Sequence, residues 1–178
     1  MRRLILLRHA KTEREAPSGK DRDRRLDERG IKDAAEMGRW LARHDYDRGL
    51  ALVSTATRAQ ETWHLMAPHL RNIQVEHVLA LYGADPSELL ELVHETSVQD
   101  PKQVLIVAHN PGLHELALGL IAGGDRDGRE ALANNLPTAG IAVIDFATHD
   151  WSEVRFHRGK LERFVSPKLL RESSGSSD

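Results

Sequence analysis

Leu4-Ile5-Leu6-Leu7-Arg8-His9-Ala10-Lys11-Thr12 is the stretch from which the fold of this chain can be worked out. Four successive apolar residues are typical of a strand buried on both faces, and this strand ends where the polar pair Arg8-His9 begins. In open α/β sheets, ligands bind outside the carboxyl ends of the strands. Arg8 and His9 therefore occupy the place where such a fold carries out its chemistry.

The composition is that of an ordinary globular domain. The chain has 178 residues, of which 40% are hydrophobic, and a formal net charge of −2, so nucleic acid and membrane are not expected partners. The chain contains no cysteine, which excludes a disulfide scaffold and a thiolate nucleophile or metal site. The apolar run after Met1-Arg2-Arg3 is too short for a secretory signal, and no run reaches transmembrane length. These features predict a cytoplasmic protein.

Helical and strand patterns alternate along the sequence. Caps and apolar spacing predict helices at Asp27 to about Arg43, Arg58 to about Leu70, Asp85 to about Glu95 and Asn110 to about Ile121. Thr57 and Gln60 have the spacing of a capping box, and Asn110 and Pro111 suit a cap and a first helical position. Further strands are expected at Leu50–Val53, Ile73–Leu79 and Val104–Ala108, with a terminal pair formed by Ile141–Phe146 and Glu153–His157.

The remaining segments are expected to be loops. Lys11 to Arg29 is dense in charge, and its arginines alternate with acids such as Asp21 and Asp23, which favours a solvated loop over a docking surface. Gly123–Gly128 and Asn134–Gly140 are predicted to be loops around a weaker helix. The polar tail, residues 172–178, is expected to be disordered.

The alternation of continuous apolar strands with helices predicts a single α/β domain over residues 1–171. Its expected architecture is a three-layer α/β/α arrangement with a mostly parallel central sheet, reached through right-handed crossovers. Helices then cover both faces of the sheet. Trp40 and Trp63 lie within predicted helices, where they are expected to pack in or near the core.

Three predicted strand ends deliver two arginines and two histidines to one edge of this sheet. Arg8 and His9 end the first strand, Arg58 follows Val53 by a few residues, and His109 ends a later strand. Arginine forks match phosphate oxygens, and free N–H groups at a helix start add donors. Each residue alone has an ordinary structural explanation, but together they predict a phosphate site.

One of the histidines, His9, is suited to act as a nucleophile. A neutral imidazole has a free lone pair, and neighbouring arginines lower the pKa of a histidine and so keep it neutral. In-line attack on phosphorus would give a phosphohistidine enzyme that water hydrolyses. This scheme needs no cofactor and no metal. The pairs His64 with His69 and His109 with His114 are five residues apart and lack a third ligand, so they do not predict a metal site.

These residues resemble the histidine phosphatase (phosphoglycerate mutase-like) superfamily. The family's Arg-His-Gly signature stands here as Arg8-His9-Ala10, its Ser-x-x-x-Arg-Ala-x-x-Thr segment as Ser54 to Thr62, and its second histidine as His109. Arg24 to Gly30 is similar to the run before the family's first helix. The resemblance spans about Met1 to Phe146 and implies a phosphoglycerate mutase-like fold.

The resemblance also implies roles for individual residues. His9 would be the nucleophile, while Arg8, Arg58 and His109 would form the phosphate pocket, and Thr12 lies where many members carry a hydroxyl near the phosphate. Ala10 replaces the usual glycine, which changes little. Many larger members have an acidic general acid after the third strand, where this chain offers only Tyr82 and Asp85, and Asp85 is already explained as a helix cap.

The missing acid favours a substrate whose leaving group departs easily. An alkoxide needs protonation, whereas an imidazole leaving from phosphohistidine needs less help. Together with the short connection from Asp85 to Val104, which leaves the pocket open, this resembles the small SixA-type phosphohistidine phosphatases, which act on phosphohistidine domains of signalling proteins. Two alternatives stay open: a phosphomonoesterase acting on a small phosphate ester, and a phosphate-binding regulatory module without turnover.

Overall fold

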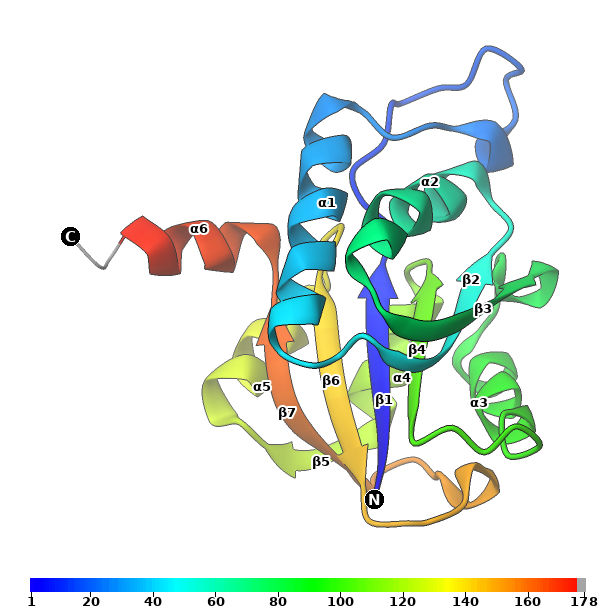
Figure 1. The fold of residues 1–178 in the computed structure, drawn as a ribbon, viewed down its shortest axis with the longest axis vertical. Helices are drawn as coiled ribbons and strands as arrows, with labels where there is room; N and C mark the ends of the chain where they lie inside the picture. Colours follow the sequence, from blue (N-terminus) through cyan, green and yellow to red (C-terminus); the bar gives the residue numbers. More distant parts are fainter. Residues whose placement is uncertain (176–178) are drawn as a thin grey trace.

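The computed structural model describes residues 1–175 as one seven-stranded sheet between two layers of helices (Figure 1). The strands are β1 (Arg2–Arg8), β2 (Arg48–Ser54), β3 (Asn72–Val78), β4 (Gln103–Ala108), β5 (Ile121–Gly124), β6 (Ile141–Phe146) and β7 (Gly159–Val165). The helices are α1 (Glu28–Arg43), α2 (Thr57–Met66), α3 (Pro86–Glu95), α4 (Gly112–Leu120), α5 (Arg126–Asn134) and α6 (Pro167–Gly175). The predicted three-layer α/β/α architecture is confirmed.

Strand β1 lies at the centre of the sheet, as its apolar run predicts. The strand order is β3-β2-β4-β1-β6-β7-β5, and the sheet is mostly parallel because β6 runs antiparallel to both of its neighbours while the other pairings are parallel. Since side chains alternate across a strand, Leu4 and Leu6 enter one core cluster, and Ile5 and Leu7 enter the other. Burial on both faces explains the unbroken apolar sequence.

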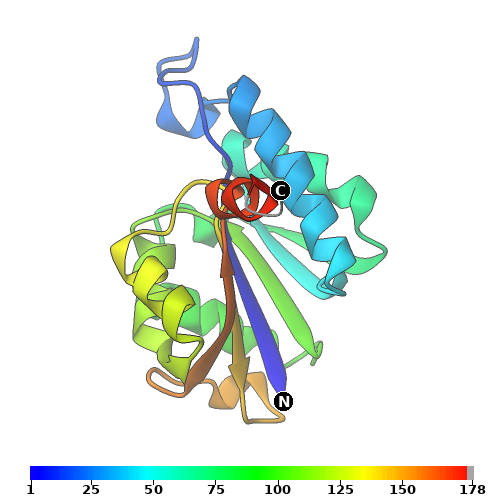
Figure 2. The ribbon, with the colours of Figure 1, turned by 90° about the vertical axis from the view of Figure 1, so that its left-hand side faces the viewer.

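The two core clusters lie under different helices, on opposite sides of the sheet (Figure 2). Helices α1 and α2 supply Met37, Leu41 and Met66 to the cluster that contains Ile5. Helices α3, α4 and α5 cover the other face, with Leu89 and other leucines. Trp40 and Trp63 are buried against α1 and α2 partners, as expected from the sequence. Within residues 1–175, no helix is long and apolar enough to cross a membrane.

Helix α1 is capped as the sequence predicts, but α2 is capped by a different residue. The Asp27 carboxylate accepts a hydrogen bond from the Gly30 N–H at 2.8 Å. The capping box expected from Thr57 and Gln60 is wrong, because the Gln60 amide donates to the Ser54 carbonyl instead and Ala56 is the cap residue. These contacts depend on the conformation of the turn after β2, which the spacing of Thr57 and Gln60 in the sequence does not predict.

The ends of two helices also differ from the prediction. Helix α2 stops at Met66, and a short 3-10 turn over Ala67–His69 follows, because Pro68 cannot continue the α-helical hydrogen bonds. Helix α4 starts at Gly112, and the predicted cap Asn110 is not used as one. The Asn110 amide donates to the Leu136 carbonyl, 26 residues away, so a tertiary contact takes the side chain from the helix end.

The partner of β6 was predicted wrongly. Glu153–His157 was expected to be a strand, but β6 pairs with Gly159–Val165, and Trp151–Glu153 forms a 3-10 turn. Asp150 caps that turn by accepting from the Ser152 N–H, and the Trp151 side chain is fully buried. This anchored turn, rather than a tight hairpin, connects the two strands.

The segment predicted as a glycine loop after Ile121 contains a short strand. Residues Ile121–Gly124 form β5, which pairs in parallel with β7, and α5 begins at Arg126. Gly124 has a φ of +112°, and a Cβ there would lie 2.3 Å from the Leu161 carbonyl oxygen. Glycine is therefore required by close backbone contact at a sheet edge, which can be mistaken for a loop signal.

Helix α6 extends into the tail that was expected to be disordered. Its first turn is held by hydrogen bonds from Leu169 and Leu170 to Ser166, and Arg171 forms an ion pair with the buried Asp33 of α1 at 3.2 Å. The helix continues from this anchored turn, so Glu172–Gly175 are helical. The rest of the predicted tail, residues 176–178, lies outside the described residues.

Candidate active site

The pairing of β1 with β4 brings two histidines together. Arg8 lies opposite Ala108 in the parallel register, and the His9 N–H donates to the Ala108 carbonyl at 3.1 Å. The imidazole rings of His9 and His109 therefore lie side by side, with their centroids 5.3 Å apart and their planes tilted by 51°. In Figure 1, both strands point toward the end of the molecule from which the 9–27 loop projects.

Arg8 and Arg58 reach the same place from β1 and from the first turn of α2. Burial, followed by the nearby positive charge of Arg58, lowers the pKa of Arg8. The Arg8 guanidinium donates to the Leu136 carbonyl at 3.2 Å. Two positive charges near each other repel, so an anion bound between the two guanidinium groups would stabilise the pair. The structure thus brings together all four residues that the sequence placed at this edge.

His9 is buried and uncharged. It is 6% exposed, and its Nδ1 lies 2.8 Å from the Ala10 carbonyl oxygen. Burial is the main reason why the pKa of His9 falls to about 3, with further lowering by His109, Arg58 and Arg8. A neutral ring that contacts a carbonyl through Nδ1 carries its proton there. The lone pair of His9 is therefore on Nε2, the atom left free to react.

A small network fixes the backbone beside this ring. The Ala10 N–H donates to the Thr62 hydroxyl at 3.0 Å, and that hydroxyl donates to the Arg58 carbonyl at 2.7 Å. Thr62 is fully buried on α2. The loop that carries His9 and the helix that carries Arg58 are thereby joined. This explains why the threonine accompanies the arginine in the sequence motif.

His109 is held through the opposite ring nitrogen. Its Nε2 lies 2.7 Å from the hydroxyl of Ser54, which ends β2. Burial, and then the charge of Arg58, lowers the pKa of His109 to about 4, so this ring is also neutral near pH 7. Ser54 is the first residue of the Ser-x-x-x-Arg-Ala-x-x-Thr segment, from which the sequence predicts no role for it. The contact shows that it positions His109.

Three buried nitrogen atoms at this edge have no hydrogen-bond partner among residues 1–175. They are Nε of Arg8, Nε of Arg58 and Nδ1 of His109. Buried donors are nearly always satisfied, and each of these groups can offer an N–H. A bound phosphoryl group would supply acceptor oxygens to guanidinium and imidazole donors together. The site is therefore chemically suited to a tetrahedral anion beside Nε2 of His9.

Sequence reasoning missed Asp21, which lies in the loop between β1 and α1. Its carboxylate accepts hydrogen bonds from Arg58 at 3.0 Å, from Arg24 at 2.9 Å and from the Tyr82 hydroxyl at 2.6 Å. The Tyr82 hydrogen bond is the main reason why the pKa of Asp21 falls to about 2. Alternating charges gave no signal for this role, because only the folded loop places Asp21 over Arg58.

Tyr82 adjoins the site, whereas no hydrogen bond or ion pair within residues 1–175 joins Asp85 to it. The Tyr82 ring lies edge-on to His109 with centroids 5.5 Å apart, and its hydrogen bond to Asp21 raises the pKa of the phenol. Asp85 caps α3 by accepting from the Glu88 N–H at 2.8 Å, and Glu88 completes the capping box. The expected cap is confirmed.

Thr12 is occupied by a contact within the same loop. Its hydroxyl accepts from Arg24 at 2.8 Å, and its backbone forms an isolated bridge with Leu26. No contact in the described range joins Thr12 to His9 or Arg58. The threonine holds the base of the loop, and its contact with phosphate stays a prediction.

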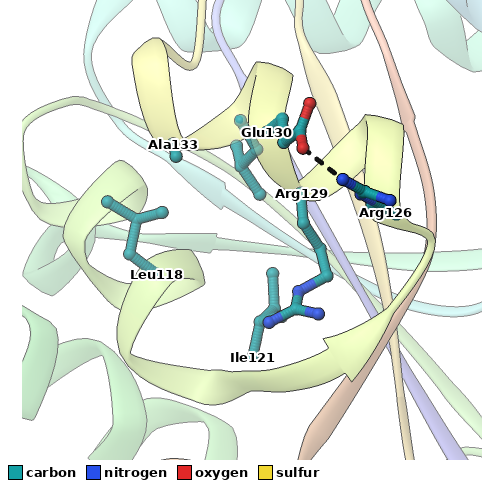
Figure 3. Close-up of a pocket in the computed structure, with 7 residues that line it drawn as sticks. Leu118, Ile121, Arg126, Arg129, Glu130 and Ala133 are labelled. Atoms are coloured by element: carbon teal, nitrogen blue, oxygen red, sulfur yellow. Dashed lines mark ion pairs between the residues drawn. The ribbon is translucent and has the colours of Figure 1, made fainter.

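A separate hollow of about 410 Å³ lies between α4, β5 and α5 (Figure 3). It is lined by Leu118, Ile121 and Leu132 together with Arg129 and an Arg126–Glu130 ion pair. None of its lining residues is a histidine, and none belongs to the cluster around His9. His9, His109 and the two arginines lie at the other site.

Comparison with known proteins points to one family. The sequence profile of the Histidine phosphatase superfamily (branch 1) matches residues 4–85, which include Arg8, His9 and Arg58. An uncharacterised protein of Mycobacterium tuberculosis is 35% identical over 165 residues, covering 91% of this chain and 100% of the relative. The similarity therefore extends through the second histidine and the C-terminal strands.

Solved structures agree with the profile. The crystal structure of a candidate phosphohistidine phosphatase SixA from Agrobacterium tumefaciens has a TM-score of 0.77 and 30% identity, covering 93% of this chain and 99% of that one. A second candidate SixA, from Nakamurella multipartitia, has a TM-score of 0.80 and 26% identity, covering 93% and 96% of the two chains.

Proposed function

This chain belongs to the histidine phosphatase superfamily and is a phosphatase, and from that premise we propose that its substrate is phosphohistidine in proteins. We propose that His9 is the nucleophile, that Arg8, Arg58 and His109 bind the phosphoryl oxygens, and that Thr12 contributes near the phosphate. The partner would be a phosphohistidine domain of a signalling protein, encountered in the cytoplasm. The proposed steps use only side chains of this chain.

In the first step, Nε2 of neutral His9 attacks phosphorus in line with the P–N bond of the substrate. That bond breaks as the new one forms, and its electron pair returns to the leaving ring. A substrate ring that carries a proton on its other nitrogen departs as neutral imidazole. The phosphoryl group then rests on a His9 ring whose Nδ1 proton is held by the Ala10 carbonyl. One imidazole has replaced another, so no acid is required.

In the second step, water attacks the phosphorus of phospho-His9. The P–Nε2 bond breaks, its electron pair returns to His9, and the product is dihydrogen phosphate, which then loses a proton to solvent. Arg8 and Arg58 would hold the equatorial oxygens in both steps, because charge is spread over them in the transition state. The enzyme returns to the neutral His9 form with which it began.

The observation that carries this proposal is the state of the polar groups around the pocket. Asp21 is ionised, the Tyr82 proton is held by Asp21, and Asp85 is committed to a helix cap. None of the three is suited to protonate an alkoxide near pH 7, which a sugar-phosphate substrate would require. An imidazole leaving group does not need that proton.

The test is a comparison of kcat/KM on a phosphohistidine protein and on small alkyl phosphate esters, with His9→Ala as the control for background hydrolysis. We expect the phosphohistidine protein to be the better substrate, and the control to be inactive on both. Faster turnover of the small esters would favour the phosphomonoesterase alternative. Phosphate binding without turnover of either substrate would favour the regulatory module.

A further inference from the structure

We propose that Asp21 is a specificity-determining residue, which accepts a hydrogen bond from the ring N–H of the phosphorylated histidine and thereby selects imidazole over oxygen leaving groups. This inference rests on the proposed function, because it assigns the residue that recognises the leaving group at the same site. It goes beyond the attack on phosphorus and the binding of phosphate, which the proposed function assigns to the two histidines and two arginines.

The position of Asp21 follows from burial. His9 is 6% exposed at the floor of the site, whereas the Asp21 side chain is 53% exposed. In-line attack requires the leaving group to lie on the side of phosphorus opposite Nε2 of His9, and therefore toward solvent. Arg58, which is as buried as His9, contacts Asp21 through two nitrogens, so Asp21 lies at the exposed side of the phosphate-binding arginine. The leaving group thus departs past Asp21.

The carboxylate is held rigidly and still has capacity to accept. Its Oδ2 receives the Tyr82 hydroxyl and Arg58, and its Oδ1 receives Arg24. A carboxylate has about four acceptor positions, so one remains, on Oδ1. Hydrogen bonds from two arginines and a tyrosine fix the orientation of the carboxylate before substrate binds. Little side-chain freedom is therefore lost when the substrate binds.

The remaining acceptor position discriminates between leaving groups by chemistry. When the nitrogen that does not carry phosphorus is protonated, the ring of phosphohistidine is positively charged and offers an N–H there. A carboxylate stabilises this protonated ring through a charge-assisted hydrogen bond, and the protonated ring is the form that departs as neutral imidazole. A phosphate ester has no donor at its leaving oxygen, which instead becomes negative and is repelled by Asp21. The same carboxylate favours one substrate class and opposes the other.

The experiment compares Asp21→Asn with wild type on free phosphohistidine and on p-nitrophenyl phosphate, whose leaving group needs no acid. We expect the ratio of kcat/KM on phosphohistidine to kcat/KM on the aryl ester to fall about tenfold, as for loss of a charge-assisted hydrogen bond made only by the imidazole leaving group. Using the ratio of the two substrates removes any shared effect on phosphate binding through Arg58.

Asp23→Asn is the matched control, because Asp23 lies on the same loop and contacts Ser18 rather than Arg58. It removes the same charge and should leave the ratio unchanged. Equal losses on both substrates in Asp21→Asn would overturn the proposal and leave Asp21 as a support for Arg58. Failure of the wild-type enzyme to hydrolyse phosphohistidine would instead overturn the proposed function, and the Asp21 proposal with it.

Discussion

His9 and His109 stand at the ends of neighbouring parallel strands and are nearly alike in burial, yet they are bound through opposite ring nitrogens. His9 contacts the Ala10 carbonyl through Nδ1, and His109 contacts the Ser54 hydroxyl through Nε2. Both rings are neutral near pH 7, since burial lowers the pKa of each. The hydrogen-bond partner of each ring, rather than the position of the residue on the sheet, therefore distinguishes the two histidines.

The consequence is a division of roles. A carbonyl can only accept, so His9 keeps its proton on Nδ1 and presents a lone pair on Nε2. The Ser54 hydroxyl accepts from the Ala56 N–H at 3.3 Å, so we expect its own proton to be donated to Nε2 of His109. His109 would then carry its proton on Nδ1, the buried atom without a partner in the described residues. One ring is suited to attack phosphorus and the other to donate to its oxygens.

The largest effect is expected from removing the proposed nucleophile, His9. We expect His9→Ala to lower kcat by at least about 10⁴-fold, because loss of a nucleophile removes the covalent route. Phosphate binding by the arginines should survive, and titration with inorganic phosphate measures it separately. Residual turnover near the wild-type rate would show that His9 is not the attacking group.

A milder change tests the second ring. We expect His109→Ala to lower kcat about 10²- to 10³-fold, the usual effect of losing one donor to transition-state charge. His109→Asn should retain more activity than His109→Gln, because the asparagine amide nitrogen can replace Nδ1 and the glutamine amide replaces Nε2. The opposite order in steady-state kinetics would reverse the nitrogen assignment.

Both histidines should also make stability depend on pH. Their folded pKa values lie below the usual 6.5, so the unfolded chain binds more protons as pH falls below 6.5. The contribution of the neutral histidines to the free energy of unfolding is therefore complete above pH 6.5. It decreases toward pH 4 by about 1.4 kcal/mol per pH unit for each histidine. Urea denaturation of wild type and His109→Gln between pH 7 and about pH 5 checks this. If the free energy of unfolding of the variant decreased as steeply with falling pH as that of wild type, His109 would not contribute to the pH dependence.

The smallest expected effect concerns Ser54. Ser54→Ala removes one hydrogen bond to His109, so we expect kcat to fall about fivefold while the fold is retained. Nitrogen NMR of the His109 ring should show the Nδ1–H tautomer in wild type and a mixture in the variant, which a purely structural role would not produce. Ser54→Thr should restore the wild-type tautomer. An Nε2–H tautomer in the wild-type enzyme would refute the arrangement.

The sequence was sufficient for the parts of the site that stand on strand ends. Arg8, His9 and His109 follow long apolar runs, and parallel strands deliver their carboxyl ends to one edge, so their meeting could be expected. Asp21 could not be found this way. Its role depends on a loop that folds back over Arg58, and its neighbours in sequence carry alternating charges that indicate only solvation.

The errors in the fold have the same origin. Gly124 has the sequence character of a loop but is required by a close backbone contact in β5, and Asn110 has the character of a cap but bonds to Leu136. In both cases a distant segment decides the outcome. Local propensity succeeded where the competing partner was also local, as in the Asp27 and Asp85 caps.

The most direct test of the central claim is to trap the intermediate. A phosphohistidine protein labelled on its phosphoryl group is mixed with the enzyme, quenched in alkali within one turnover, and the enzyme is mapped by mass spectrometry. The predicted result is a phosphoryl group on His9 that appears and decays at rates matching turnover. Label on His109, or full turnover with no labelled histidine, would contradict it.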